Sequence, residues 1–196
     1  METEENLPAT NNPKFFYIPV SRLVIMSIVT IGVYQAYWIY KNWKYLKGRY
    51  NMNIAPFWRG IFGVFFIHSL LNHIIKEPEV NKIRKAEFSA SGLATGWVII
   101  SILGGIFMRF LYNDIEKEDI WDIEVSSTLY LLGMIILPFL CLFFLPVQKY
   151  INSVNDSIEP RPSYSELSGG HYVCLVIGIL TWIFSIYTLF SNLDYL

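Results

Sequence analysis

Four long runs without a charged side chain constrain this 196-residue chain more than any other feature of its sequence. Each run is close to the ~20 residues that an α-helix needs to cross a bilayer. Inside lipid, a helix lets a single segment satisfy its own backbone hydrogen bonds. Hydrophobic residues make up 54% of the chain and charged residues 16%, whereas soluble proteins carry about 25% charged residues. The four runs are residues 23–40, 88–108, 125–147 and 167–193.

The sequence therefore predicts an all-α fold, a polytopic membrane helical bundle. This composition excludes a soluble cytosolic enzyme, a disordered tail and a secreted disulfide-rich domain. The net charge of −1 provides no general attraction to nucleic acid, so we expect no nucleic-acid partner.

A fifth segment, residues 60–75, is also uncharged but is short and becomes polar in its second half. Such a segment is more typical of a re-entrant or interfacial helix than of a span. Lysine and arginine accumulate on the cytoplasmic side of membrane proteins. If the segment spans, the basic residues divide eight against seven, and if it does not, they divide eleven against four. The second division defines an orientation, so we predict four spans and keep five as the alternative.

The predicted layout begins with a flexible lead over residues 1–15, followed by a single membrane domain over residues 16–196. Residues 41–89 are expected in the cytoplasm and both termini outside. The acid-rich stretch 114–124 is then an external loop. Within the domain we expect spans at about 22–40, 88–109, 125–147 and 170–192, an amphipathic helix at 41–51, and a re-entrant or interfacial segment at 57–75.

Residues 41–51 have the pattern of a basic amphipathic helix. At about 100° per residue, Ile39, Trp43, Leu46 and Tyr50 share one face, and lysines occupy the other. The apolar face is expected at the acyl boundary, with the lysines toward anionic lipid phosphates. A compatible reading is that the lysines only mark the cytoplasmic side. The predicted residues that bind lipid or a partner are Lys41, Trp43, Lys44, Lys47, Arg49, Trp58 and Arg59.

Two groups of residues form a recognisable pattern. The first is Pro19-x-x-Arg22-Leu23, Ser27-x-x-Thr30-x-Gly32-x-Tyr34-x-x-Tyr37-Trp38-x-Tyr40-Lys41-Asn42-Trp43 and Pro56-Phe57-Trp58-Arg59. The second is Leu145-Pro146-Val147-Gln148 with Asn152 and Asn155, then Gly178 and Trp182. Together they resemble a family of short, uncharacterised bacterial inner-membrane proteins, over about residues 16–59 and 138–190. The resemblance implies the bacterial cytoplasmic membrane and four or five helices, and it implies no activity.

The sequence shows no catalytic or metal-binding pattern. All sixteen acidic residues lie outside the apolar segments, which argues against a proton pump. His68 and His73 are about 140° apart on a helix, so they do not share a face as a zinc-binding pair does. No serine stands in a G-x-S-x-G turn. We therefore expect no enzyme activity, no cofactor and no metal.

Small residues in the second span favour close helix packing. They are Gly92, Gly96, Gly104 and Gly105, and we expect them to meet a neighbouring helix of the same chain, with a homodimer as the alternative. The overall prediction is a non-enzymatic accessory subunit or membrane-organising factor of a bacterial inner membrane, with anionic lipids and a membrane-protein partner or second copy as its partners. The alternative is a small transporter or channel, with these glycines, Pro138 and the group His68, Asn72 and His73 lining a passage.

Overall fold

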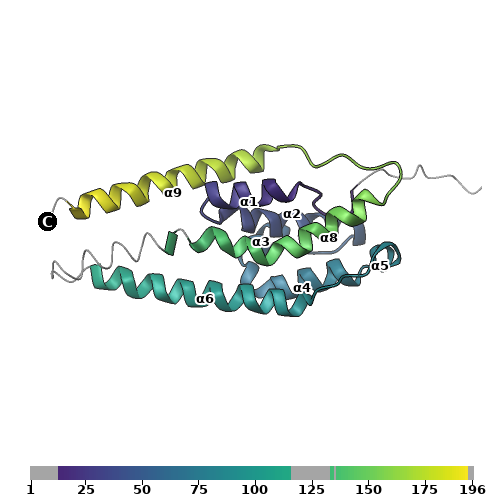
Figure 1. The fold of residues 1–196 in the computed structure, drawn as a ribbon, viewed down its shortest axis with the longest axis horizontal. Coiled ribbons are helices and arrows are strands. Elements are labelled where there is room, and N and C mark those ends of the chain that lie inside the picture. The colour runs from purple at the N-terminus through teal and green to yellow at the C-terminus, as the bar shows by residue number, and fades with distance from the viewer. Residues whose placement is uncertain (1–12, 116–132, 135, 194–196) are drawn as a thin grey trace, which may run out of the picture.

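In a computed structural model, residues 13–115, 133–134 and 136–193 are described. The described part of the chain is helical throughout, without a strand. Three of its helices are long and apolar enough to cross a membrane, so the chain is a membrane protein of the predicted all-α class. Figure 1 shows them lying along the long axis of the molecule. Their apolar stretches are Ala90–Phe107, Ile136–Asp156 and Gly169–Tyr187.

These three helices overlap the three later predicted spans. The first belongs to α6 (Ala90–Ile115) and the last to α9 (Gly169–Leu193). The middle one passes through a 3-10 turn, η1 (Leu140–Phe144), into α8 (Leu145–Asp156). It therefore continues beyond residue 147, where the predicted third span ends. Residues 125–132 and 135 of that prediction lie outside the described residues. Of the acid-rich stretch predicted as a loop over 114–124, residues 114–115 form the end of α6 and the rest lies outside the described residues.

The first apolar run differs from its prediction. A single helix over 22–40 is wrong, because the chain forms α1 (Val20–Val29) and α2 (Val33–Tyr50) with a turn between them. Ile31 and Gly32 both have positive φ, 48° and 85°, and two left-handed residues end a right-handed helix. Thr30 supports the turn, since its hydroxyl donates to the Met26 carbonyl and accepts from the Tyr34 amide.

Contacts beyond the turn show that α1 and α2 are antiparallel. The backbone N–H of Phe16, which precedes α1, donates to the Asn42 side chain of α2 at 3.1 Å. The Arg49 guanidinium, near the end of α2, lies 5.4 Å from the centre of the Phe15 ring. The chain therefore returns to where it started, and α1 and α2 form a helical hairpin (Figure 1).

The tip of this hairpin reaches the middle of the long helices. A Cβ on Gly178 would lie 2.5 Å from the Thr30 Cα, so only glycine permits this approach, and Gly178 is the central residue of its apolar stretch. Gln35 in the first turn of α2 bonds to Trp97, which is close to the centre of the apolar stretch of α6. The hairpin thus runs beside only one half of the apolar stretches of α6 and α9. Along the middle helix, contacts with the hairpin and the segment before it extend from Leu137 to Asn155.

Two further helices cover the hairpin. Helix α3 (Pro56–Ile61) packs on α2, since a Cβ on Gly60 would lie 2.7 Å from the Tyr40 Cβ. Helix α4 (Gly63–Lys76) lies against α6, with His68 Nε2 3.0 Å from Thr95 Oγ1. A short α5 (Pro78–Ile83) follows. Residues 57–75, predicted as one re-entrant or interfacial segment, therefore belong to two helices that meet at Phe62. We call α1 to α4 the packet.

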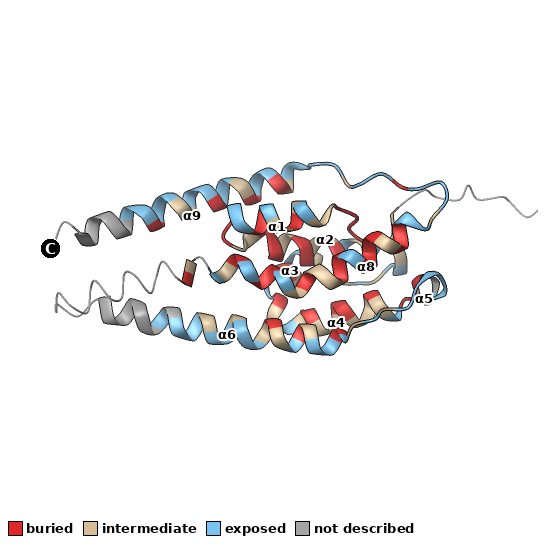
Figure 2. Cartoon of the chain, in the orientation of Figure 1, coloured by how far each residue is buried: buried red, intermediate tan, exposed pale blue. Residues whose placement is uncertain are grey.

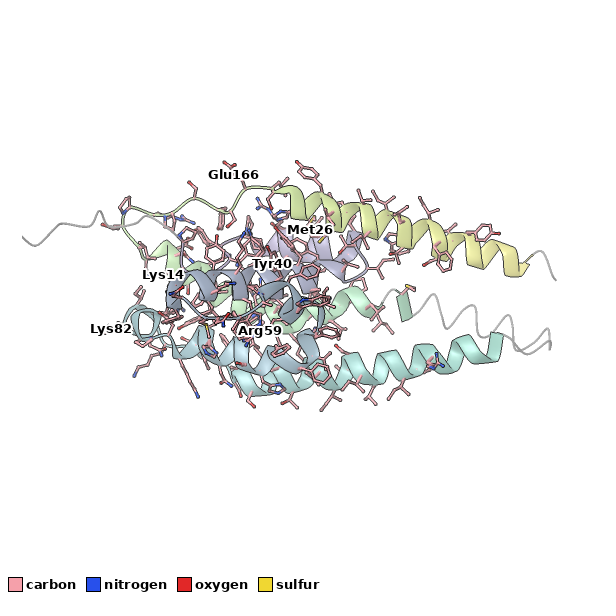
Figure 3. All side chains as sticks on the ribbon, turned by 180° about the vertical axis from the view of Figure 1, so that it is seen from behind. Lys14, Met26, Tyr40, Arg59, Lys82 and Glu166 are labelled. Carbon is pink, nitrogen blue, oxygen red and sulfur yellow. The ribbon has the colours of Figure 1, made fainter. Side chains whose placement is uncertain are left out.

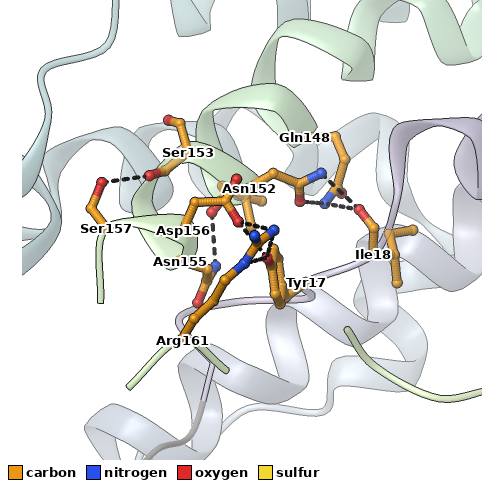
Figure 4. Close-up of polar contacts among 10 residues, drawn as sticks. Tyr17, Ile18, Gln148, Asn152, Ser153, Asn155, Asp156, Ser157 and Arg161 are labelled. Carbon is orange, nitrogen blue, oxygen red and sulfur yellow. Dashed lines mark hydrogen bonds and ion pairs between the residues drawn. The ribbon is translucent and has the colours of Figure 1, made fainter. Parts of the chain in front are cut away.

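The segment before α1 is fixed by α8. Three amide side chains, one turn apart, face it: Gln148, Asn152 and Asn155 (Figure 4). Asn155 pairs with both backbone groups of Lys14, accepting from its N–H at 2.7 Å and donating to its carbonyl at 2.9 Å. Phe15 is buried. The predicted flexible lead over 1–15 is therefore wrong at Lys14 and Phe15, while residues 1–12 lie outside the described residues.

The core lies inside the packet and against α8. Trp38 stacks on Phe144 with ring centres 4.8 Å apart, and Trp97 approaches the same ring at 5.5 Å. Figure 2 shows that buried residues gather around α1, α2, α4 and α8, whereas the parts of α6 and α9 beyond the packet are largely exposed. Within the described residues, protein therefore covers the packet end of the bundle, and the apolar side chains of α6 and α9 beyond the packet are open to another apolar medium.

Candidate functional site

The predicted lipid-facing side of the amphipathic helix is buried in protein. Trp43 has no exposed surface, and Ile39 and Leu46 have almost none. The prediction that this face lies in lipid is therefore wrong at these three residues, because α3 and α4 already cover them. The fourth residue of the face, Tyr50, is 45% exposed. Sequence periodicity gives the apolar face of a helix but does not show whether lipid or protein meets it.

Arg59 binds to this buried aromatic centre. Its guanidinium lies 4.2 Å from the centre of the Trp43 ring and 5.0 Å from that of Phe66. Figure 3 shows Arg59 in the region where α2, α3 and α4 meet. A guanidinium between two aromatic faces contributes cation–π attraction of about 0.5–2 kcal/mol. Arg59 therefore joins α3 to α2 and α4 within the chain.

The other predicted basic residues have separate environments. Lys41 lies over the rings of Phe16 and Tyr37, at 5.2 and 5.9 Å, and burial, together with the neighbouring Lys44, lowers the pKa of its ammonium group. The Lys47 ammonium donates to the Ile54 carbonyl at 2.9 Å.

Arg49 forms an ion pair with the buried Glu77 at 3.5 Å, whereas Lys44 is exposed. The structure therefore does not bring the predicted basic residues together as one lipid-binding face.

One part of the apolar surface that remains exposed on the packet lies on α3 and the start of α4, and another lies on α1. Trp58 is 56% exposed and Phe65 is 76% exposed. We call the part on α3 and α4 the aromatic patch; its residues are Phe57, Trp58, Ile61, Phe62 and Phe65. Trp58 is the one predicted lipid-binding residue in it. The signal for the others was the dense aromatic content of residues 57–66, which periodicity alone did not assign to a face.

Gln35 provides the polar contact at the hairpin tip. Its Oε1 accepts from the Trp97 indole N–H at 3.0 Å, and its Nε2 donates to the carbonyls of Leu137 and Pro138 at 3.2 and 3.4 Å. The carbonyls of Leu137 and Pro138 lie just before the 3-10 turn η1, where the regular helical bonding pattern changes, and they accept from Gln35 there. One glutamine therefore joins the hairpin to two long helices. Sequence analysis missed it, although a glutamine within an apolar run is a signal for such a bond.

A small cavity of about 240 Å³ lies beside Gln35. Its lining is mainly aliphatic and glycine, with Gln35 and Ser101 among its few polar side chains. The residues expected to line a passage do not gather here. His68 bonds to Thr95, and His73 Nδ1 bonds to the Ser69 carbonyl in its own helix.

The four predicted packing glycines have different surroundings. A Cβ on Gly96 would lie 2.5 Å from the Phe143 ring, so Gly96 permits α6 to approach the middle helix. At Gly92 the nearest side chain is that of Ser89, in the residues just before the helix. A Cβ added to Gly104 or Gly105 would have no described residue of another element within 4 Å. Only Gly96 therefore has the expected contact with another helix in the described part of the chain.

A polar cluster closes the packet at the end opposite the C-terminus of α9. The Tyr17 hydroxyl donates to Asp156 at 2.5 Å, and Arg161 pairs with Asp156 at 2.6 Å and donates to the Tyr17 oxygen at 3.0 Å (Figure 4). Burial and the bond to Asp156 raise the pKa of Tyr17 to about 12. The phenol therefore stays neutral at physiological pH and can donate to the carboxylate.

The described residues thus give a half-depth hairpin, a set of buried amides and one exposed aromatic patch. No family model matches the sequence, and no curated protein or solved structure is similar to it. The resemblance to short bacterial inner-membrane proteins remains a prediction from the residue pattern, and the geometry of the packet is the basis for assigning a function.

Proposed function

We propose that this chain is a three-span protein of a bacterial cytoplasmic membrane and that it organises the membrane by filling one leaflet with its packet. It acts without enzymatic chemistry, through lipid and lateral contacts. One observation carries this proposal: the hairpin tip at Thr30 meets α9 at Gly178, the centre of the apolar stretch. In this topology, a hairpin that ends midway along α9 occupies one leaflet, and within the described part of the chain only the long helices continue into the other.

The distribution of basic residues supports this topology. If the first apolar run turns back, every basic residue except Arg109 and Lys117 lies on the packet side, which places thirteen of the fifteen there. The four-span arrangement predicted from sequence divides them eleven against four. Because basic residues accumulate in the cytoplasm, the packet side is the cytoplasmic side.

The shape of the packet supports a role in membrane organisation. The exposed apolar residues of α1, Ile25, Ile28 and Val29, lie near the hairpin tip, and the aromatic patch lies on α3 and α4. In the proposed topology both surfaces face acyl chains of the cytoplasmic leaflet. Apolar wedges inserted into one leaflet favour membranes in which that leaflet is on the convex side.

The long helices add a surface for lateral contacts. Beyond the packet, α6 exposes Leu103 and α9 exposes Leu180, at 59% and 60%, and Gly104 and Gly105 have open space beside them within the described residues. Small residues let a second helix approach closely in lipid. This surface fits the membrane-protein partner or second copy expected from the sequence.

A curvature-sorting experiment tests the proposal. The full chain is reconstituted into vesicles extruded to several diameters, and the fraction with the packet in the outer leaflet is measured by protease protection. We expect this fraction to rise as the diameter falls. A Phe65→Ser variant should weaken the dependence, whereas Leu103→Ser, which changes an equally apolar site outside the packet, should not. The same fraction at every diameter would overturn the proposal.

A further inference from the structure

Basic side chains come together outside the region that the sequence pattern indicated. A cavity of about 470 Å³ opens between the first turns of α8 and the linker that joins α5 to α6. Arg84, Lys85 and Lys149 line it, together with one carboxylate, Glu87. We propose that this cavity binds the phosphate group of an anionic phospholipid.

The charge of the cavity favours an anion. Three cationic side chains face one carboxylate, and all four residues are exposed to solvent. Within the described part of the chain, none of the three cations forms an ion pair with a carboxylate. Arginine and lysine bind phosphate through charge-assisted hydrogen bonds. A phosphate entering here would meet cationic groups that are not already paired.

The walls of the cavity fix the backbone from which these cations extend. Tyr150 is buried, and its hydroxyl donates to the Arg84 carbonyl at 2.9 Å, which joins the linker to α8. The Phe88 ring meets the Tyr150 ring edge-on, with centres 5.8 Å apart. Ser153 donates to the Tyr150 carbonyl at 2.8 Å. Arg84 and Lys149 therefore come from two elements that are fixed against each other, so the site is preorganised.

The position of the cavity selects a lipid over a soluble anion. The apolar stretch of α6 begins at Ala90, two residues after Phe88, so the cavity lies where α6 enters the membrane. Phe88 and Pro146 supply apolar side chains to its lining. Basic pockets at the cytoplasmic ends of membrane helices bind lipid headgroups. A lipid can place its phosphate among the cations and its glycerol and acyl chains along these side chains.

Native mass spectrometry of the full chain tests the site. The chain is released from nanodiscs made of phosphatidylcholine and phosphatidylglycerol, and retained lipid is counted. We expect retention of phosphatidylglycerol, and at least a tenfold loss of retention in the double variant Arg84→Gln, Lys149→Gln. The matched control, Lys44→Gln with Lys47→Gln, removes two basic charges from α2 and should retain lipid as the unmodified chain does. Equal loss in both variants would overturn the proposal.

A charge change in the opposite direction separates binding from misfolding. Glu87→Gln removes the one carboxylate among the described lining residues and should increase phosphatidylglycerol retention, which a damaged fold would not do. No increase would contradict the proposal. Inorganic phosphate is also added, to distinguish a lipid phosphate from a free one. If the site binds lipid, phosphatidylglycerol stays bound in the presence of phosphate. If phosphate is retained in place of the lipid, the site binds the free anion and the lipid assignment is overturned. Curvature sorting is measured separately, so this site can fail while the proposed function stands.

Discussion

Alanine at Gly32 should destabilise the chain, although alanine normally stabilises a helix. Gly32 lies at the hairpin tip with φ of 85°. An L-residue pays about 1–2 kcal/mol in the left-handed region. The new Cβ would also lie 3.3 Å from Gln35 Nε2 and 3.4 Å from the Leu137 carbonyl oxygen. We therefore expect the free energy of unfolding to fall by about 1–2 kcal/mol.

The sign of this change in the free energy of unfolding distinguishes a hairpin from a single continuous helix. In the interior of a continuous helix, replacing glycine with alanine gains about 0.5–1 kcal/mol. Gly48 provides the matched control, because it lies within α2 and has nothing within 4 Å of its would-be Cβ. Gly48→Ala should stabilise by about 0.5–1 kcal/mol.

The assay is reversible unfolding of the purified full chain in mixed micelles, titrated with dodecyl sulfate and followed by tryptophan fluorescence. Gly32→Ala and Gly48→Ala should move the midpoint in opposite directions. If Gly32→Ala stabilised the chain as much as Gly48→Ala does, the reasoning about the turn would be refuted, since residues 30–33 would then be helical.

Two further substitutions test the packing of the core. Gln148→Met removes the acceptor of the buried Trp38 indole N–H, which lies 2.6 Å away, and should cost about 1–3 kcal/mol; an unchanged midpoint in the same titration would contradict this. Gly96→Ala places a Cβ 2.5 Å from the Phe143 ring and should destabilise by about 1–3 kcal/mol. Gly105→Ala meets open space within the described residues and should be neutral or stabilising, so equal losses at both glycines would argue against the contact.

Composition and charge were enough to predict a membrane protein built from helices. The apolar stretches of α6 and α9 correspond closely to uncharged runs, because crossing lipid requires an unbroken apolar segment. The first run has the same composition yet turns back at Ile31 and Gly32. Hydropathy measures how readily each residue enters lipid and carries no information about chain direction. The turn was visible only as a Thr-Ile-Gly sequence inside the run.

The candidate site was harder to predict, because an apolar face of α2 could be covered either by lipid or by another helix. Trp43 and Leu46 form a regular stripe, and their periodicity is the same whether lipid or α4 covers them. Gln148 and Asn152 formed part of the family pattern, but their role depends on the segment before α1, more than a hundred residues away. Long-range contacts of this kind cannot be inferred from local spacing.

The most direct test of the central claim is the sidedness of the two ends of the hairpin. Single cysteines are introduced by Thr10→Cys, Lys47→Cys and Lys117→Cys in a chain whose Cys141 and Cys174 are replaced by serine, and each is labelled in intact and opened cells with an impermeant maleimide. The proposed topology predicts that positions 10 and 47 react together from the cytoplasmic side and position 117 from the outside. Labelling of positions 10 and 47 from opposite sides would contradict it.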